Sequence, residues 1–473
     1  MSLAFGLFLG VFVFTLFLSM PVAWAMGFAT VVYLVVSGQW AMFPVLTEKL
    51  FQGMDAFVLV AIPMFLLAGE IFSEGKITQR LVAFADALFG WIRGGIAQVA
   101  VGACIFFAGI TGVALGEIAA LGRIFIPAMV KEGYPAPLAA AIIASASIIG
   151  PTIPPSLPII IYGSVTNVSI GGMFAAAVVP GLLIGVANML LIAWLSKRLG
   201  IKPRRSDHSL ATIARTGWGA LLPLGMPVLI LASILGGLMT PTEASGSSVA
   251  YAMVCAFVIY RSLSMSALPA ILSRVGLFSG QLIIIVACGS ALAWVLGFEN
   301  TTSRLSAAVV SWDLGPIGIM LVANVVMLIL GMFIDPSTSI ILFGPILAAA
   351  ASAAGIDPLH FGVVMILNLN IGLITPPLGV SLFAAERIAG CGLSAVIRAV
   401  IPFIIVNICA LVLVSCIPAI SLWLPRMAGF WDSNQRFKLT ATGIDGISIH
   451  WYISIKLREP DSNRRSRLMR PSG

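Results

Sequence analysis

Charge is the scarcest property of this sequence. Only 9% of its 473 residues are Asp, Glu, Lys or Arg, whereas 60% are hydrophobic and the mean hydropathy is +1.08. A soluble domain carries about 25% charged residues. Several apolar runs reach the roughly 18–20 residues that cross a bilayer as a helix, which excludes an outer-membrane barrel with strands of about 10 residues. The sequence therefore predicts an all-α polytopic membrane protein.

Metal-binding and catalytic residues are also scarce. The chain has three histidines and six cysteines, with no CxxC pair. It contains no HExxH motif, no paired catalytic Asp motif and no Ser with a credible base, so an enzyme, including an intramembrane one, is disfavoured. We expect no cofactor. The net charge of +8 lies in Lys and Arg between apolar runs, as on cytoplasmic loops, and does not indicate nucleic acid.

No Lys or Arg precedes Lys49, so we expect the N-terminus outside and the first apolar run to be a spanning helix, not a signal peptide. The loop 196–209 contains five basic residues, and the linker 196–215 is predicted to be cytoplasmic. Apolar runs predict membrane spans near residues 2–19, 22–37, 54–72, 169–196, 216–236, 245–260, 276–298 and 396–424.

Two halves of the chain resemble each other. Gly150-x3-Pro154-Pro155 recurs 222 residues later as Gly372-x3-Pro376-Pro377, and other Gly and Pro positions share nearly the same offset. This pattern indicates an internal duplication. Five crossings plus one re-entrant hairpin in each half would invert the second copy. The predicted division is a first inverted repeat at 1–195 with a hairpin near 97–130, the basic linker at 196–215, a second inverted repeat at 216–429 with a hairpin near 315–353, and a polar tail at 430–473, interpreted as disordered or as a reading-frame artefact.

Each half contains a helix-breaking motif, IGPTIPPS (149–156) and IGLITPPLG (371–379). Irregular backbone at membrane depth is tolerated where it is buried in protein or lines a cavity, and its carbonyl oxygens can coordinate a cation such as Na⁺. Each break needs a partner, and FAGITGVALGE (107–117) and GMFIDPSTS (331–339) are predicted hairpin tips. The alternative is that both tips are ordinary kinks within spanning helices.

Two Na⁺ sites and a substrate path follow from this pairing. The first Na⁺ site is predicted to comprise Gly109, Thr111, Gly112, Gly150, Pro151 and Thr152. The second is predicted to comprise Gly331, Asp335, Thr338, Gly372, Thr375 and Pro376. The substrate path is predicted to include Thr152, Ser156, Asn368 and Asn370.

Several polar residues in these regions have two interpretations. Asp335 is a functional-site candidate and also a good N-cap, and the two roles are compatible. Glu117 is a site candidate or pairs with a neighbouring helix, the latter being favoured. Asn368 and Asn370 line the path or bond across helices. Glu70, near the end of a span, is interpreted as interfacial or structural.

At this point the motifs resemble those of a family. The chain is similar to the large membrane subunit of tripartite ATP-independent periplasmic (TRAP) transporters over about residues 1–429. The resemblance is carried by AIPMFLLAGEIFSEG (61–75), RGG (93–95), FAGITGVALGEIAALG (107–122), IGPTIPPSLPIIIYG (149–163), LMTPTEASG (238–246), GMFIDPSTSIIL (331–342) and GIDPLHFGVVMILNLNIGLITPPLG (355–379).

The resemblance implies an elevator-type ion transporter fold in the bacterial inner membrane. It also implies two Na⁺ sites at the paired tips and breaks. Implied partners are a small four-helix membrane subunit, expected as a separate chain, and a periplasmic substrate-binding protein. Val113 and Glu117 depart from the family's usual first tip, where a second hydroxyl residue and an Asp stand.

We therefore expect a Na⁺-coupled secondary transporter subunit that imports a small organic anion of the C4-dicarboxylate or sugar acid class. The alternative is a stand-alone Na⁺/carboxylate symporter or antiporter of the same two-hairpin superfamily.

Overall fold

The computed structural model describes residues 3–18, 20–75, 77–201 and 209–430. Within these ranges every regular element is a helix, which confirms the predicted all-α class. All of the helices lie in the compact unit Met1–Ala428. The predicted tail 430–473, apart from Phe430, and residues 202–208 of the predicted linker lie outside the described residues.

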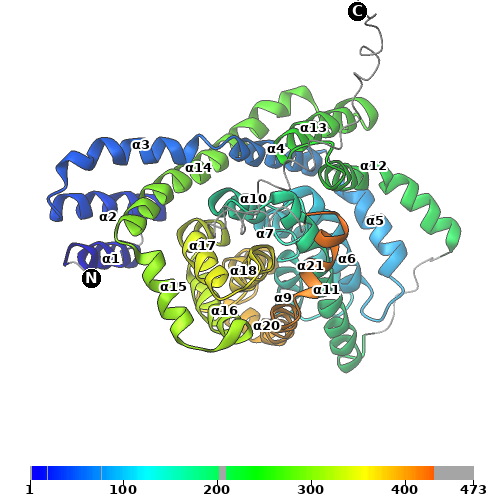
Figure 1. Ribbon diagram of the computed structural model, residues 1–473. Coiled ribbons are helices and arrows are strands. Elements are labelled where there is room, and N and C mark those ends of the chain that lie inside the picture. Colours follow the sequence, from blue (N-terminus) through cyan, green and yellow to red (C-terminus); the bar gives the residue numbers. More distant parts are fainter. Residues whose placement is uncertain (1–2, 19, 76, 202–208, 431–473) are drawn as a thin grey trace, which may run out of the picture. The chain divides into compact units, whose positions relative to one another are not determined.

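One set of helices, the outer group, is built around the long helix α14. Helix α14 packs against α2, α3 and α4, while α13 packs on α4 and α12 on α5. Figure 1 shows α3, α4 and α14 side by side. The outer group comprises α1 (Leu3–Phe17), α2 (Val22–Val36), α3 (Phe43–Met54), α4 (Ala61–Glu74), α5 (Thr78–Phe89), α12 (Leu210–Leu235), α13 (Pro241–Met253) and α14 (Leu268–Phe298).

The second set, the central group, takes helices from both halves of the sequence (Figure 1). Helix α20 packs on α9 and α11, and α17 packs on α10. Helix α15 (Thr301–Ser311) follows the outer group and packs on α17. The central group comprises α6 (Ile96–Thr111), α7 (Ala114–Glu117), α8 (Arg123–Lys131), α9 (Ala136–Ser147), α10 (Leu157–Thr166), α11 (Ile170–Arg198), α16 (Gly315–Phe333), α17 (Pro336–Ala353), α18 (Pro358–Gly372), α19 (Val380–Ala389), α20 (Leu393–Cys416) and α21 (Ala419–Met427).

Eight helical segments among the described residues are long and apolar enough to cross a membrane. One predicted span, 396–424, is wrong as a single helix because α20 ends at Cys416 and α21 begins at Ala419. Pro418 lies between them; proline has no backbone N–H and disfavours helical backbone at the preceding residue. The eight segments are Phe57–Glu74, Ile170–Arg198, Leu210–Leu235, Pro241–Ile259, Met265–Phe298, Gly315–Phe333, Pro336–Ala353 and Leu393–Cys416.

Polar residues fix where several of these helices begin. Ser156, Ser169 and Asp335 are N-caps whose side chains accept a hydrogen bond from a backbone N–H in the first turn of α10, α11 and α17 respectively. At α13, Thr240 and Glu243 form a reciprocal capping box. Such caps satisfy N–H groups that have no partner within the helix, so the sequence itself sets these boundaries.

Both predicted hairpin tips turn the chain back on itself. Helix α6 contacts α8 beyond the first tip, and α16 contacts α17 beyond the second. A π-helical turn, Ile118–Gly122, joins α7 to α8. Helices α16 and α17 are each long enough to span by length alone, so the re-entrant and inverted arrangement of the halves remains a prediction.

Candidate functional site

The two helix breaks have several local features in common. Helix α9 ends at Ser147 and α10 begins at Leu157, while α18 ends at Gly372 and α19 begins at Val380. In the first break the Thr152 hydroxyl donates to the Ile148 carbonyl at 2.8 Å. In the second, the Thr375 hydroxyl donates to the Ile371 carbonyl at 2.7 Å. The bonds Pro154–Pro155 and Pro376–Pro377 are both cis. Both breaks therefore contain a Pro-Pro pair and a threonine hydroxyl that donates to the carbonyl four residues earlier. The two threonines are not equivalent in the repeat, because Thr152 stands two residues after Gly150 and Thr375 stands three residues after Gly372.

The first hairpin tip packs directly on the first break. Gly112 ends α6 with φ +59°, a left-handed conformation that favours glycine. A Cβ on Gly112 would lie 2.6 Å from the Pro155 carbonyl oxygen, and one on Gly109 would lie 3.6 Å from the Pro154 carbonyl oxygen. The structure thus brings Gly109 and Gly112 against the carbonyl oxygens of the break. The Thr111 hydroxyl is 3.5 Å from the Phe107 carbonyl of its own helix.

The second hairpin packs on the second break through two glycines. A Cβ on Gly331 would lie 3.1 Å from Leu369 Cα and 3.3 Å from Gly372 Cα. Asp335 caps α17, because its carboxylate accepts from the Thr338 backbone N–H at 3.2 Å and also from the Thr338 hydroxyl. The N-cap role of Asp335 is therefore confirmed, and its role toward an ion stays a prediction.

The three remaining predicted path residues make hydrogen bonds that differ in what they join. Asn368 Nδ2 on α18 donates to the Asn324 carbonyl at 2.8 Å and to Asn324 Oδ1 at 2.9 Å, across to α16. Asn370 Nδ2 donates to the Thr152 hydroxyl oxygen at 3.0 Å, which connects α18 to the first break. Ser156 caps α10 and donates to the Pro151 carbonyl. The interpretation that these amides bond across helices is thus confirmed for Asn368, whereas Asn370 bonds to a residue of the break.

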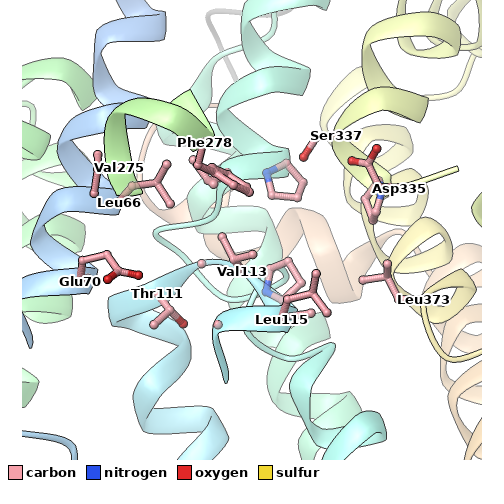
Figure 2. A pocket seen from close by; sticks show the side chains of 18 of the residues that line it. Leu66, Glu70, Thr111, Val113, Leu115, Val275, Phe278, Asp335, Ser337 and Leu373 are labelled. Carbon is pink, nitrogen blue, oxygen red and sulfur yellow. The ribbon is translucent and has the colours of Figure 1, made fainter. Parts of the chain in front are cut away.

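A pocket of about 490 Å³ lies between the outer group and both hairpin tips. Figure 2 shows Leu66 and Glu70 of α4 on one side, Thr111 and Val113 of the first tip below, and Asp335 of the second tip opposite. Its polar lining is sparse, so the few polar groups decide what it can hold. Of the predicted site residues, those that line the pocket are Thr111, Gly112, Pro151, Asp335 and Asn370. The pocket lining does not include Gly109, Gly150, Thr152, Ser156, Gly331, Thr338, Asn368, Gly372, Thr375 or Pro376.

Two charged pocket residues were not among the predicted site residues. Arg274 of α14 pairs with Glu70 of α4 at 3.0 Å and with Glu74 at 2.7 Å. Both Glu70 and Arg274 line the pocket. The only signal in the sequence was an acidic residue within an apolar run, because the partner arginine lies 204 residues further along the chain.

Glu117 is fully buried at the contact between the first hairpin and the first break. A Cβ on Gly150 would collide with its carboxylate, and the Cys104 thiol of α6 lies beside it. Neither of its oxygens accepts a geometrically satisfactory hydrogen bond from a described residue. The favoured interpretation is that Glu117 pairs with a neighbouring helix. Among the residues that the structure describes, the Cys104 thiol is the one candidate for such a partner.

Residues 9–420 match the family model described as "Tripartite ATP-independent periplasmic transporter, DctM component". A C4-dicarboxylate TRAP transporter large permease protein, DctM, of Pseudomonas aeruginosa is 39% identical over 81% of this chain and 90% of that protein. An ectoine TRAP transporter large permease protein, TeaC, of Halomonas elongata is 34% identical over 81% of this chain and 90% of that protein.

A third relative is longer than this chain. The isethionate TRAP transporter permease protein DctMQ of Oleidesulfovibrio alaskensis is 34% identical over 88% of this chain, which spans 65% of that protein. Among solved structures, the Alcanivorax borkumensis YdaH transporter matches with a TM-score of 0.57 over 84% of this chain and 90% of that chain. At 16% identity this likeness shows the fold alone.

The family match covers most of the chain, and all eight candidate spans lie within it. Relatives at 34–39% identity are named TRAP transporter large permease proteins. The chain therefore belongs to the DctM component family of tripartite ATP-independent periplasmic transporters, as a multi-pass inner-membrane transport protein and not an enzyme.

Proposed function

We propose that this permease imports a small organic anion together with Na⁺. The observation that carries the proposal is the pocket where both hairpin tips meet α4 and α14. Each tip packs on a broken helix whose carbonyl oxygens are brought close to it, such as the Pro155 oxygen beside Gly112 and the Leu369 oxygen beside Gly331. Oxygen ligands of this kind suit a hard cation, and broken helices form such sites in secondary transporters.

The charge of the pocket supports the coupling to Na⁺. Among its lining residues are two carboxylates, Glu70 and Asp335, and one guanidinium, Arg274. An anion entering a lining with an excess negative charge is repelled, and the low local dielectric strengthens that repulsion. Cations bound at the two breaks would offset it. We therefore propose the predicted sets around Thr152 and Thr375 as the two Na⁺ sites.

The relatives support an organic acid as substrate without fixing which one. The names of two of them state C4-dicarboxylate and isethionate, and a third states ectoine. The first two compounds are anions, and a pocket with one arginine and an otherwise largely apolar lining suits a small molecule with one or two acidic groups. We propose the C4-dicarboxylate or sugar acid class.

The family name implies a system of three components. We propose that the partners of this chain are a small four-helix membrane subunit and a periplasmic substrate-binding protein, and that the central group moves against the outer group during transport. The division of the helices into two groups that meet at the pocket is consistent with such a movement.

Reconstitution tests the proposed function. The purified chain is placed in liposomes with and without the small subunit and the binding protein from the same genome, and uptake of radiolabelled succinate or N-acetylneuraminate is measured. An inward Na⁺ gradient is compared with an equal choline gradient. We expect uptake only with all three components and with Na⁺. Uptake by the chain alone would support the stand-alone symporter, and equal uptake in choline would refute the coupling to Na⁺.

A further inference from the structure

Arg274 forms an ion-pair triad with Glu70 and Glu74 at the edge of the pocket. Its Nε donates to Glu70 at 3.2 Å, and its Nη2 donates to Glu70 at 3.0 Å and to Glu74 at 2.7 Å. The three side chains are 39–48% exposed. Ion pairs at this exposure contribute about 0–1 kcal/mol to stability. The triad is therefore a poor stabiliser of the α4–α14 contact, and a role in holding the fold does not explain it.

The guanidinium is the basic group of the pocket lining. An arginine side chain has five N–H donors in a planar fork, which matches a carboxylate with two parallel hydrogen bonds. Nε and Nη2 of Arg274 are occupied, and Nη1 donates no hydrogen bond to any residue that the structure describes. A further carboxylate, the third, can therefore approach through Nη1 and take Nη2 from Glu74.

Glu70, which holds Arg274, faces the same cavity as the hairpin tips. Figure 2 shows Glu70 of α4 on the side of the cavity opposite Asp335, with Thr111 between them. An anion that pairs with Arg274 thus lies in the space bounded by the first and second tips. The basic group belongs to the outer group, whereas the tips and the breaks belong to the central group.

We propose that Arg274 binds an acidic group of the substrate in this pocket, and that it exchanges Glu74 for that group while Glu70 keeps its contact with Nε. This inference rests on the proposed transport of an organic anion. The exchange replaces one ion pair with another, so the guanidinium is never left without a partner. The guanidinium is also partly desolvated before the substrate arrives, which lowers the desolvation cost of the new pair. Glu74 competes with the substrate for Nη2 and so weakens binding and favours release.

Arg274→Gln tests the proposal in the full three-component system, with initial uptake of succinate and N-acetylneuraminate measured against substrate concentration. A lost charge-assisted contact corresponds to about tenfold or more in affinity, so we expect KM to rise about tenfold. Arg274→Lys keeps the charge without the fork and should raise KM by about threefold. Glu74→Gln removes the competitor and should lower KM by about two- to fivefold.

Arg80→Gln is the matched control. Arg80 lies on α5 and stacks over the Tyr260 ring at 4.2 Å, outside the pocket lining, so its KM should equal that of the wild type. A variant that inserts poorly into the membrane would also take up less substrate, so a second measurement is needed. It is the thermal unfolding midpoint of the solubilised chain, with and without 10 mM succinate, isethionate or N-acetylneuraminate. The wild type should be stabilised by at least one probe, and Arg274→Gln should lose that response.

The outcomes separate the inference from the proposed function. A wild type that transports and is stabilised by a probe, with Arg274→Gln and Glu74→Gln unchanged in both assays, overturns the inference and leaves the transport of an organic anion standing. A wild type that neither takes up nor responds to any of the three probes overturns both.

Discussion

Removing the hydroxyl of Thr152 should lower the free energy of unfolding more than removing that of Thr375, although each hydroxyl donates to the carbonyl four residues earlier. The Thr375 hydroxyl has one hydrogen bond, to Ile371 at 2.7 Å. The Thr152 hydroxyl donates to Ile148 at 2.8 Å and also accepts from Asn370 Nδ2 at 3.0 Å. Thr→Val keeps the shape, so the loss is that of the hydrogen bonds.

The magnitudes follow from these contacts. Thr375→Val loses one bond, worth about 0.5–1.5 kcal/mol, whereas Thr152→Val also leaves the buried Asn370 amide without a partner, which adds about 1–3 kcal/mol. We expect losses of about 1 and about 3 kcal/mol in the free energy of unfolding, measured by SDS titration in mixed micelles with far-UV circular dichroism. Asn370→Leu combined with Thr152→Val should cost less than the sum of the single changes, because both remove the same bond.

Thr30→Val is the control for this comparison. Thr30 is buried in α2, where its hydroxyl donates to the Met26 carbonyl at 2.8 Å, the same type of bond away from either break. It should lose about 1 kcal/mol with an unchanged Na⁺ requirement for uptake. Both break variants should raise the Na⁺ concentration at half-maximal uptake. Equal destabilisation by Thr152→Val and Thr375→Val, or an unchanged Na⁺ requirement in both, would refute the reasoning.

Three further changes have defined outcomes. Gly372→Ala should reduce both thermal stability and Na⁺-dependent uptake, because its Cβ would lie 2.6 Å from Gly331 Cα and overpacking costs about 1–3 kcal/mol. The control Gly280→Ala, whose Cβ would have nothing within 4 Å, should reduce neither. Normal uptake by Gly372→Ala would contradict the close packing. Asp335→Asn should keep the cap of α17 and the unfolding midpoint, whereas Asp335→Ala should lose about 1 kcal/mol in the free energy of unfolding. If Asp335→Asn nevertheless raises the Na⁺ requirement for uptake, the negative charge itself contributes to ion binding. An unchanged Na⁺ requirement would leave Asp335 as a cap alone. Thr240→Ala opens the capping box with Glu243 and should cost about 0.5–1 kcal/mol with uptake unaffected, so a loss of uptake would show that this exposed corner takes part in transport.

The breaks could be predicted from the sequence because their cause is local. A Gly followed by a Pro-Pro pair excludes helical hydrogen bonds over several residues whatever surrounds it. A single proline does not always end a helix. Pro402 lies inside α20 without ending it, whereas Pro418 separates α20 from α21. Because the flanking sequence does not distinguish the two prolines, the predicted span 396–424 ran across the real boundary.

The pocket could be predicted only in part because its charges come from distant helices. The tip residues Thr111 and Asp335 carry a local signal, a polar residue at a turn within an apolar run. Glu70 and Arg274 lie in ordinary spanning helices, and their role depends on the packing of α4 against α14. From the sequence, Glu70 is interpreted as interfacial or structural, because the sequence does not show which helix faces it.

The two proposed ion sites differ in a way that a repeated motif alone does not reveal. At the second tip, Asp335 and Thr338 supply side-chain oxygens, although each already bonds the other. At the first tip, Val113 has no side-chain oxygen, and the Pro154 and Pro155 carbonyls lie beside the tip glycines Gly109 and Gly112. Carbonyl oxygens are fixed by the backbone and cannot rotate away, so an ion at the first site depends on the packing of the tip on the break. Thr152 also accepts a hydrogen bond from Asn370 in the opposite half of the sequence, a contact that Thr375 does not make with any residue that the structure describes.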